Sequence, residues 1–254
     1  MSKMIPGADS SMAKSMRSGI DFPLVDLHAH LEGDLSLERA VQLAQERDVK
    51  LGIVEHGGRG QEIGDDDALM RYVESLEAYP VHKGMQAEGL DWMVCFSKEA
   101  ISRLDYILSD ALTFPEKGGR LVQLWQPQVR IENAQDFMDR YVDFNVLVIT
   151  SEPIDILANP TFLPACIADR YDELWPRERM EKVIEAAIQH DVAIEINSRY
   201  NIPSAAFVRM ARVAGVRFSF GSNQHGEDVG KLEYCLRMAK ECELTRQDMF
   251  VPGE

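Results

Sequence analysis

Short apolar runs rich in β-branched residues alternate along this chain with longer segments in which apolar residues recur every three or four positions. The first pattern is typical of buried strands and the second of amphipathic helices. Regular alternation of the two predicts a parallel sheet with crossover helices. The predicted strands cover residues 23–27, 50–55, 84–92, 104–108, 145–150, 192–197 and 216–221, and the clearest helices cover 36–48, 133–143, 177–190, 204–214 and 229–242.

Helix starts and long loops refine this pattern. Ser36, Asn133 and Ser204 stand at N-cap positions, where a side-chain oxygen can accept a hydrogen bond from the first turn of a helix. Long loops are expected around 57–67 and 109–130. Loops over the carboxyl ends of parallel strands are where α/β proteins place their sites.

A chain of 254 residues with 45% hydrophobic content can form one large α/β domain, which we expect over residues 23–254. Residues 1–22 are polar and predict a flexible N-terminal arm with no apolar leader. No run approaches the roughly 18 apolar residues of a spanning helix, so no membrane contact is expected. The four cysteines form no CxxC pair, which favours a reducing, cytoplasmic location.

The charge limits the partners. A formal net charge of −15 argues against sequence-independent binding to nucleic acid, which depends on basic contacts to phosphate. We therefore expect a small-molecule substrate and no nucleic acid. That substrate can be anionic, because bound cations reverse the field inside a pocket. The oligomeric state is left open.

The stretch VDLHAH (25–30) places two histidines at the end of a predicted strand. Strand side chains alternate between faces, so Asp26, His28 and His30 are predicted to share one face, inside a closed barrel. Two imidazoles at this spacing suit Zn, Mn or Fe, and Glu32 and Asp34 add oxygen donors nearby. The alternative is a merely polar strand terminus.

Further polar residues follow other predicted strands. Four of the six histidines fall at strand ends, whereas His82 and His190 do not and receive no role. For any one of these residues, a structural side chain is the simpler interpretation. The residues that could join His28 and His30 at the barrel mouth are His56, Glu88, Asp110 and His225.

The same stretches carry a family resemblance. HAHLEGDLSLERAVQLAQERDVKLGIVEHGG resembles the first motifs of the polymerase and histidinol phosphatase (PHP) superfamily. In the same order, LDYILSDA resembles the family segment ending in SxH, DILANP the one containing HP, AIEINS the strand before the last motif, and GSNQH the closing GSDAH. The resemblance spans roughly residues 23 to 240.

This resemblance implies a distorted (β/α)7 TIM-like barrel that binds up to three metal ions for phosphoester hydrolysis. It implies that His28, His30 and Glu88 hold one ion and that His56 and His225 serve another. Three positions depart from the family pattern. Ser109, Asp110 and Ala111 stand where SxH is expected, Asn159 replaces the histidine of HP, and Asn223 replaces the acid of GSDAH.

These departures reduce the expected number of ions to one or two divalent ions per chain. His28, His30 and Glu88, with help from Asn223, could hold one ion and leave a position for water. A second ion would have Glu88, Asn159 and Asp110. Three interpretations of Asp110 stay open: a ligand, a general acid or base, or the cap of a loop.

Other residues complete the predicted site. Glu195 and Asn197 alternate with apolar neighbours, so both are expected to point inward, and Arg199 could bind an anionic group. The predicted catalytic residues are Asp110 and His225, and the predicted substrate-binding residues are Arg199, Asn197 and Asn159.

Three functions are considered. The first is a metal-dependent hydrolase of the phosphoesterase type that uses a metal-activated water. The second is a mononuclear metal-dependent enzyme on a sugar, an amide or a lactone. The third is a non-catalytic binding or regulatory barrel.

Overall fold

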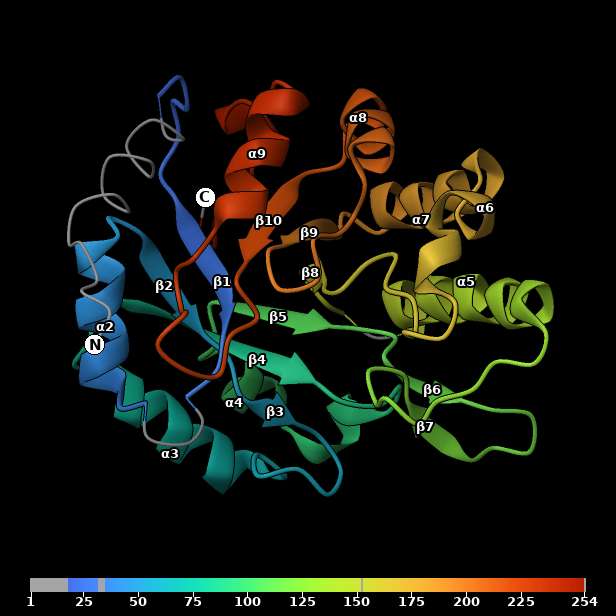
Figure 1. Cartoon of the computed structure of the whole chain (residues 1–254). Helices are drawn as coiled ribbons and strands as arrows, with labels where there is room; N and C mark the ends of the chain where they lie inside the picture. Colours follow the sequence, from blue (N-terminus) through green and yellow to red (C-terminus); the bar gives the residue numbers. More distant parts are fainter. Residues whose placement is uncertain (1–17, 32–34, 152, 254) are drawn as a thin grey trace, which may run out of the picture.

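The computed structural model describes residues 18–31, 35–151 and 153–253. Within these ranges, parallel strands close into a seven-stranded barrel with helices between them, which confirms the predicted single-domain α/β TIM-like barrel (Figure 1). In order around the barrel, the strands are β1 (Val25–Ala29), β2 (Lys50–Ile53), β4 (Val81–Ala87), β5 (Tyr106–Ser109), β8 (Ile156–Leu157), β9 (Ala193–Asn197) and β10 (Phe218–Gly221), which pairs again with β1.

The short strand β3 (His56–Gly57) extends the line of β2. β2 pairs with the first half of β4 and β3 with its second half, through His56 opposite Gln86. The chain therefore makes one interrupted strand here. The interruption, at residues 54 and 55, falls close to the barrel mouth.

Helices surround the barrel and cover its outer surface (Figure 1). The main apolar core lies between the helices and the strands and includes the fully buried Phe207 and Phe218. The longer helices are α2 (Leu37–Glu46), α3 (Asp66–Leu76), α5 (Ala134–Ser151), α7 (Arg177–Gln189), α8 (Ala205–Ala214) and α9 (Glu233–Glu241), and the short ones are α4 (Lys98–Ile101) and α6 (Tyr171–Leu174).

The predicted N-caps are confirmed. Ser36 and Ser204 accept hydrogen bonds from the backbone of the third residue after them. Asn133 accepts through Oδ1 from the backbone N–H groups of Gln135 and Asp136, at 3.1 Å each. These contacts satisfy donors that the first turn of a helix leaves free.

The predicted strand at 145–150 is wrong, because these residues form the last part of α5. Tyr141, Val142, Asn145, Val148 and Ile149 are buried, a spacing that matches one face of a helix. Packing of this face outweighs the β-propensity of the run NVLVIT. The strand that fills this place in the barrel is β8, whose two residues are too few to show a period.

Strand β1 contains an irregularity that changes which side chains point inward. Between Asp26 and Ala29 its register against β2 shifts, as in a β-bulge. Leu27 packs with Tyr106 in the apolar cluster inside the barrel, and His28 also points inward, toward Glu195. Asp26 instead bonds to the chain outside the barrel, so the prediction that it shares a face with His28 and His30 is wrong.

One aromatic ring, that of Tyr106, is part of the apolar cluster inside the barrel. Tyr106 is 1% exposed, and its hydroxyl donates to the carbonyl of Leu27 across the barrel at 2.9 Å. A Cβ atom at Gly52 would lie 2.3 Å from Tyr106 Oη, and one at Gly84 would lie 2.3 Å from Cζ. Two glycines thus provide the space that this ring occupies.

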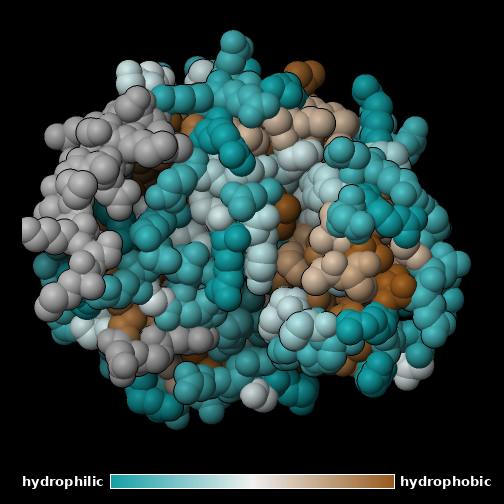
Figure 2. Space-filling view, viewed as in Figure 1, coloured by the Kyte–Doolittle hydropathy of each residue, from teal (hydrophilic) through white to brown (hydrophobic). Residues whose placement is uncertain are grey.

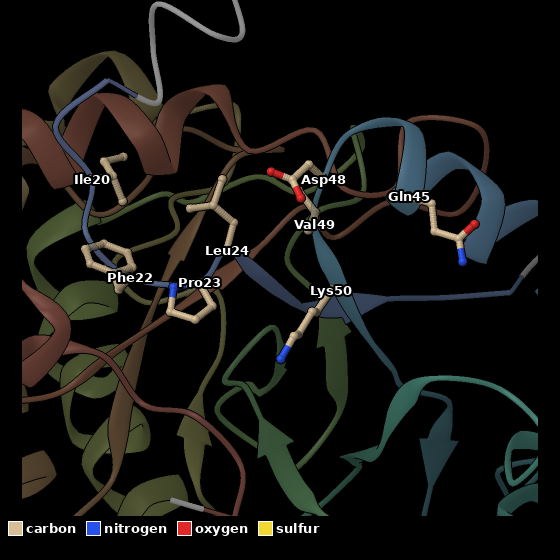
Figure 3. Close-up of a pocket in the computed structure, with 8 residues that line it drawn as sticks. All are labelled: Ile20, Phe22, Pro23, Leu24, Gln45, Asp48, Val49 and Lys50. Atoms are coloured by element: carbon tan, nitrogen blue, oxygen red, sulfur yellow. The ribbon is translucent and has the colours of Figure 1, made fainter.

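Two surface features lie away from the mouth. At the amino end of the barrel, Ile20, Phe22 and Leu24 border a groove of about 470 Å³, with Lys50 of β2 also at its edge (Figure 3). Phe22, within the predicted arm, is buried, and residues 1–17 lie outside the described residues.

Beside α5 and the hairpin of β6 (Thr113–Pro115) and β7 (Leu121–Gln123), apolar residues gather on an otherwise mainly hydrophilic face (Figure 2). No described helix has the length and apolar character needed to span a membrane.

Candidate functional site at the barrel mouth

Four imidazole rings lie together where the strands end at the barrel mouth. The ring centroids of His28 and His30 are 5.2 Å apart. His30 lies 4.9 Å from His56 and 4.5 Å from His225, and the His30 and His225 planes differ by only 2°. The structure therefore brings together the four histidines that the sequence places after strands.

His28 is held by a carboxylate of β9. Its Nδ1–H donates to Glu195 Oε1 at 2.7 Å, and both side chains are buried. A Cβ atom at Gly221 would lie 1.9 Å from that same carboxylate oxygen, so glycine at this position of β10 makes room for the pair. The inward orientation predicted for Glu195 is thus explained by a specific partner.

His56 and His30 have carboxylates of their own nearby. His56 Nδ1–H donates to Glu88 Oε1 at 2.7 Å. Glu55 Oε2 lies 4.0 Å from His30 Nδ1, beyond hydrogen-bond distance, while Glu55 Oε1 accepts from Leu31 N at 2.9 Å. Among the described residues, His30 Nδ1 is a buried nitrogen with no hydrogen-bond partner.

The imidazoles differ in protonation because their surroundings differ. Burial alone would lower the pKa of His28, but the charge and hydrogen bond of Glu195 outweigh burial and raise it. The pKa of His56 is raised in the same way, by Glu88 against burial. Burial, together with the neighbouring imidazoles, holds the pKa of His30 well below its ordinary value, so His30 is neutral at pH 7.

A network of side-chain amides fills the space between the carboxylates. Asn159 donates through Nδ2 to Asp110 Oδ2 at 2.7 Å and through its backbone N–H to Glu195 Oε2 at 2.6 Å. The amides of Asn197 and Asn223 donate to Asn159 Oδ1 at 3.0 and 2.9 Å. Burial, followed by the nearby Glu88, raises the pKa of Asp110 to about 6.

Arg199, predicted to bind substrate, lies at the edge of this network. Arg199 donates to the carbonyl of Asn223 at 2.8 Å, and its guanidinium lies 5.7 Å from the ring centre of Tyr200. It is exposed beside the mouth. Glu32 and Asp34, suggested as additional oxygen donors, lie outside the described residues.

Asp26 stabilises the mouth from outside the barrel. Its Oδ1 accepts from the backbone N–H groups of His28 and Ser222, at 3.2 and 2.9 Å, and its Oδ2 accepts from Gly230 at 2.8 Å. These bonds tie the bulge of β1 to both ends of the loop that carries His225. Asp26 thus ties the first strand of the barrel to the loop that follows the last strand.

Sequence reasoning missed two residues of the site. Gln86 is buried among His28, Glu88 and Asp110, and Glu55 lies beside His30. Both could have been found. Gln86 lies two residues before Glu88 on the same strand face, and Glu55 directly precedes His56.

The donor set has the chemistry for a divalent ion, with neutral and carboxylate-paired imidazoles beside acidic groups. Among the described residues, however, no group of three or more His, Cys, Asp or Glu side chains is arranged to hold an ion. For His30 and His225 the ring planes are parallel, and the in-plane lone pairs of stacked rings cannot meet at one point. One ring has to turn before both nitrogens can reach the same ion at about 2.0–2.1 Å.

No protein-family model matches the chain, and no curated protein matches its sequence. Among solved structures, a chain in a cryo-EM structure of archaeal ribonuclease P with mature tRNA is similar, with a TM-score of 0.44 and 14% sequence identity. The similarity covers 91% of this chain and 98% of that chain.

This finding corrects two expectations from the sequence. A metal-dependent hydrolase acting on small molecules, and the exclusion of nucleic acid as a partner, both disagree with a similar chain found in an assembly with tRNA. Neither expectation is retained. At this TM-score the similarity assigns no role to the chain, and the geometry of the mouth is the basis for a functional assignment.

Proposed function

We propose that this protein is a binding barrel that holds one divalent transition-metal ion at its mouth, with His30, His56 and His225 as the ligands. The observation that carries the proposal is His30 itself. Its ring is 1% exposed and lies between two other imidazoles, and its Nδ1 makes no hydrogen bond within the described part of the chain.

A buried nitrogen without a partner is costly, about 1–3 kcal/mol. Its low pKa leaves His30 neutral, and a neutral imidazole is the form that binds a metal ion. A bound ion would give this nitrogen the partner that the protein chain does not provide. Held by ring nitrogens, the ion would supply Lewis acidity to the mouth.

The neighbouring carboxylates support the same assignment. Metal-binding histidines commonly donate their other ring N–H to a carboxylate, which fixes the ring and raises the basicity of the free nitrogen. His56 has such a partner in Glu88, with Nδ1 bound and Nε2 left for a ligand. Glu55, Glu88 and Asp110 also make the field at the mouth favourable for a cation.

The test is metal binding by protein that carries no affinity tag and has been stripped with a chelator. Titration with Zn²⁺ in a calorimeter and elemental analysis after gel filtration are expected to give one ion per chain. Replacement by Co²⁺ reports the ligand geometry through its visible absorption. The same protein is then titrated into labelled tRNA, with and without Zn²⁺, because nucleic acid is no longer excluded as a partner.

Two substitutions test two of the three proposed ligands. His56→Ala and His30→Gln are expected to weaken Zn²⁺ binding at least about tenfold, since loss of a ligand or its support has effects of this size. His190→Ala is the matched control, because His190 caps the carboxyl end of α7 at the opposite end of the barrel. A chain that binds no ion, or variants that bind as the parent does, would refute the proposal.

A further inference from the structure

Gln86 occupies the middle of the mouth without being part of the ligand set just proposed. It belongs to β4, faces the barrel interior together with Glu88, and is 6% exposed. Its amide touches three groups. Oε1 lies 3.1 Å from His28 Nε2, and Nε2 donates to Glu88 Oε1 at 3.1 Å and to Asp110 Oδ2 at 3.5 Å.

The contact with Gln86 occupies Nε2, the one nitrogen of His28 that could bind an ion. His28 Nδ1 is already bound to Glu195, so Nε2 is its remaining ligand atom. With the amide oxygen of Gln86 facing it, Nε2 must carry a proton. If the amide were turned, its NH₂ group would donate to the lone pair of Nε2 instead. In both orientations the lone pair is unavailable to a metal ion.

The orientation with the oxygen toward His28 is the one that fits the surroundings. The NH₂ group of Gln86 then donates to two carboxylates, whereas the turned amide would place its oxygen against both. The chain Glu195, His28, Gln86, Glu88 is thus a continuous series of hydrogen bonds with every donor facing an acceptor. The backbone of Gln86 is fixed between His56 and Leu108 on the neighbouring strands.

We infer that Gln86 keeps His28 from binding metal and so limits the mouth to a single ion. This inference rests on the proposed function. Without the Gln86 side chain, His28 Nε2, Glu88 and Asp110 would face the same space. An imidazole and two carboxylates are three protein ligands, the number that suffices for an ion that also keeps water. The presence of Gln86 therefore determines whether the mouth binds one ion or two.

The experiment counts ions per chain in four proteins by calorimetry and elemental analysis with Zn²⁺. The parent is expected to bind one ion and Gln86→Ala two. The double variant Gln86→Ala/His28→Gln is expected to return to one ion. Gln123→Ala is the matched control, because Gln123 is an exposed amide on β7 and its loss should leave one ion bound.

A second measurement uses the unaltered chain, in case Gln86→Ala fails to fold. In ¹⁵N spectra of the imidazole side chains, Zn²⁺ is expected to shift the ring nitrogens of His30 and His56 and to leave His28 Nε2, which faces Gln86, without the shift of a metal-bound nitrogen. A shift of His28 Nε2 to the position of a metal-bound nitrogen would overturn the inference.

The outcomes separate this inference from the function on which it rests. One ion in both the parent and Gln86→Ala would overturn the role of Gln86 and leave the proposed function intact. No ion in the parent but one in Gln86→Ala would refute the proposed function and, with it, the inferred limit of one ion. No ion in either protein would overturn both.

Discussion

The two ends of the barrel interior are built on different principles. At the amino end, Tyr106 fills the space above Gly52 and Gly84 in an apolar layer, and its single polar atom is hydrogen bonded. At the carboxyl end the interior holds four imidazoles, several carboxylates and a network of amides. The first end is suited to stability and the second to binding, although the same strands run through both.

The difference shows how a small barrel can have a costly polar mouth. Burying polar and charged groups opposes folding unless each finds a partner, and His30 Nδ1 lacks one within the described residues. A close-packed apolar layer beneath the mouth offsets this cost. Substitutions should therefore change stability strongly at the amino end and binding strongly at the carboxyl end.

The largest expected effect tests the amino end. In Gly84→Ala the new Cβ would lie 2.3 Å from Tyr106 Cζ, so the ring or the strand must move. We expect the free energy of unfolding to fall by about 3 kcal/mol, the upper range for overpacked cores. Urea denaturation measures it. Gly226→Ala is the control, with nothing within 4 Å of its Cβ, and an equal loss there would show that packing around Tyr106 is not the cause.

The next effect concerns the connection between the two ends. Asp26→Asn replaces one acceptor oxygen by a donor, so at least one of the three backbone N–H groups bound by Asp26 loses its partner. The expected loss of stability is about 2 kcal/mol. Hydrogen exchange should show faster exchange at Ser222 or Gly230 than in the parent. Unchanged protection at both amides would contradict the anchoring role.

A smaller effect on stability, with a large one on binding, is expected at the mouth. His56 is 35% exposed, so His56→Ala should lower the unfolding free energy of the metal-free protein by no more than about 1 kcal/mol. The same variant should lose most of the increase in Tm that Zn²⁺ gives the parent. If His56→Ala lost as much stability as Gly84→Ala, the proposed difference between the two ends of the barrel would be contradicted.

The smallest effect is a pH dependence at the amino end. Burial lowers the pKa of His82, at the start of β4, against the partial opposition of Asp105. The folded state then binds fewer protons than the unfolded state, so stability is present above about pH 6.5 and is lost as the pH falls below it. His82→Gln should flatten the stability profile between pH 7.5 and 5.5 by less than about 1 kcal/mol. A profile identical to the parent would exclude the contribution.

Much of the barrel was predictable because its local signals agree with its packing. The caps at Ser36, Asn133 and Ser204, and six of the seven predicted strands, follow from side-chain chemistry and periodicity. The strand predicted at 145–150 was wrong because the buried face of a long helix can also contain β-branched residues. Strand β8 was not predicted, because a strand of two residues shows no alternation of apolar and polar side chains.

The site was predicted less completely than the fold. That His28, His30, His56 and His225 meet follows from their positions after strands. The bulge that turns Asp26 outward, and the amide of Gln86 beside His28, depend on register and rotamer, which no single stretch of sequence displays. The PHP resemblance and the cytoplasmic location stay predictions.

Closure of the barrel through β1 and β10 has a consequence for the order of events during synthesis. His30 stacks on His225, so the mouth joins residues near the two ends of the chain. The ribosome must release the chain as far as His225 before this stack can form. Until then β1 and β9 each lack their neighbour and present an open edge, which is the kind of surface that chaperones and aggregation compete for.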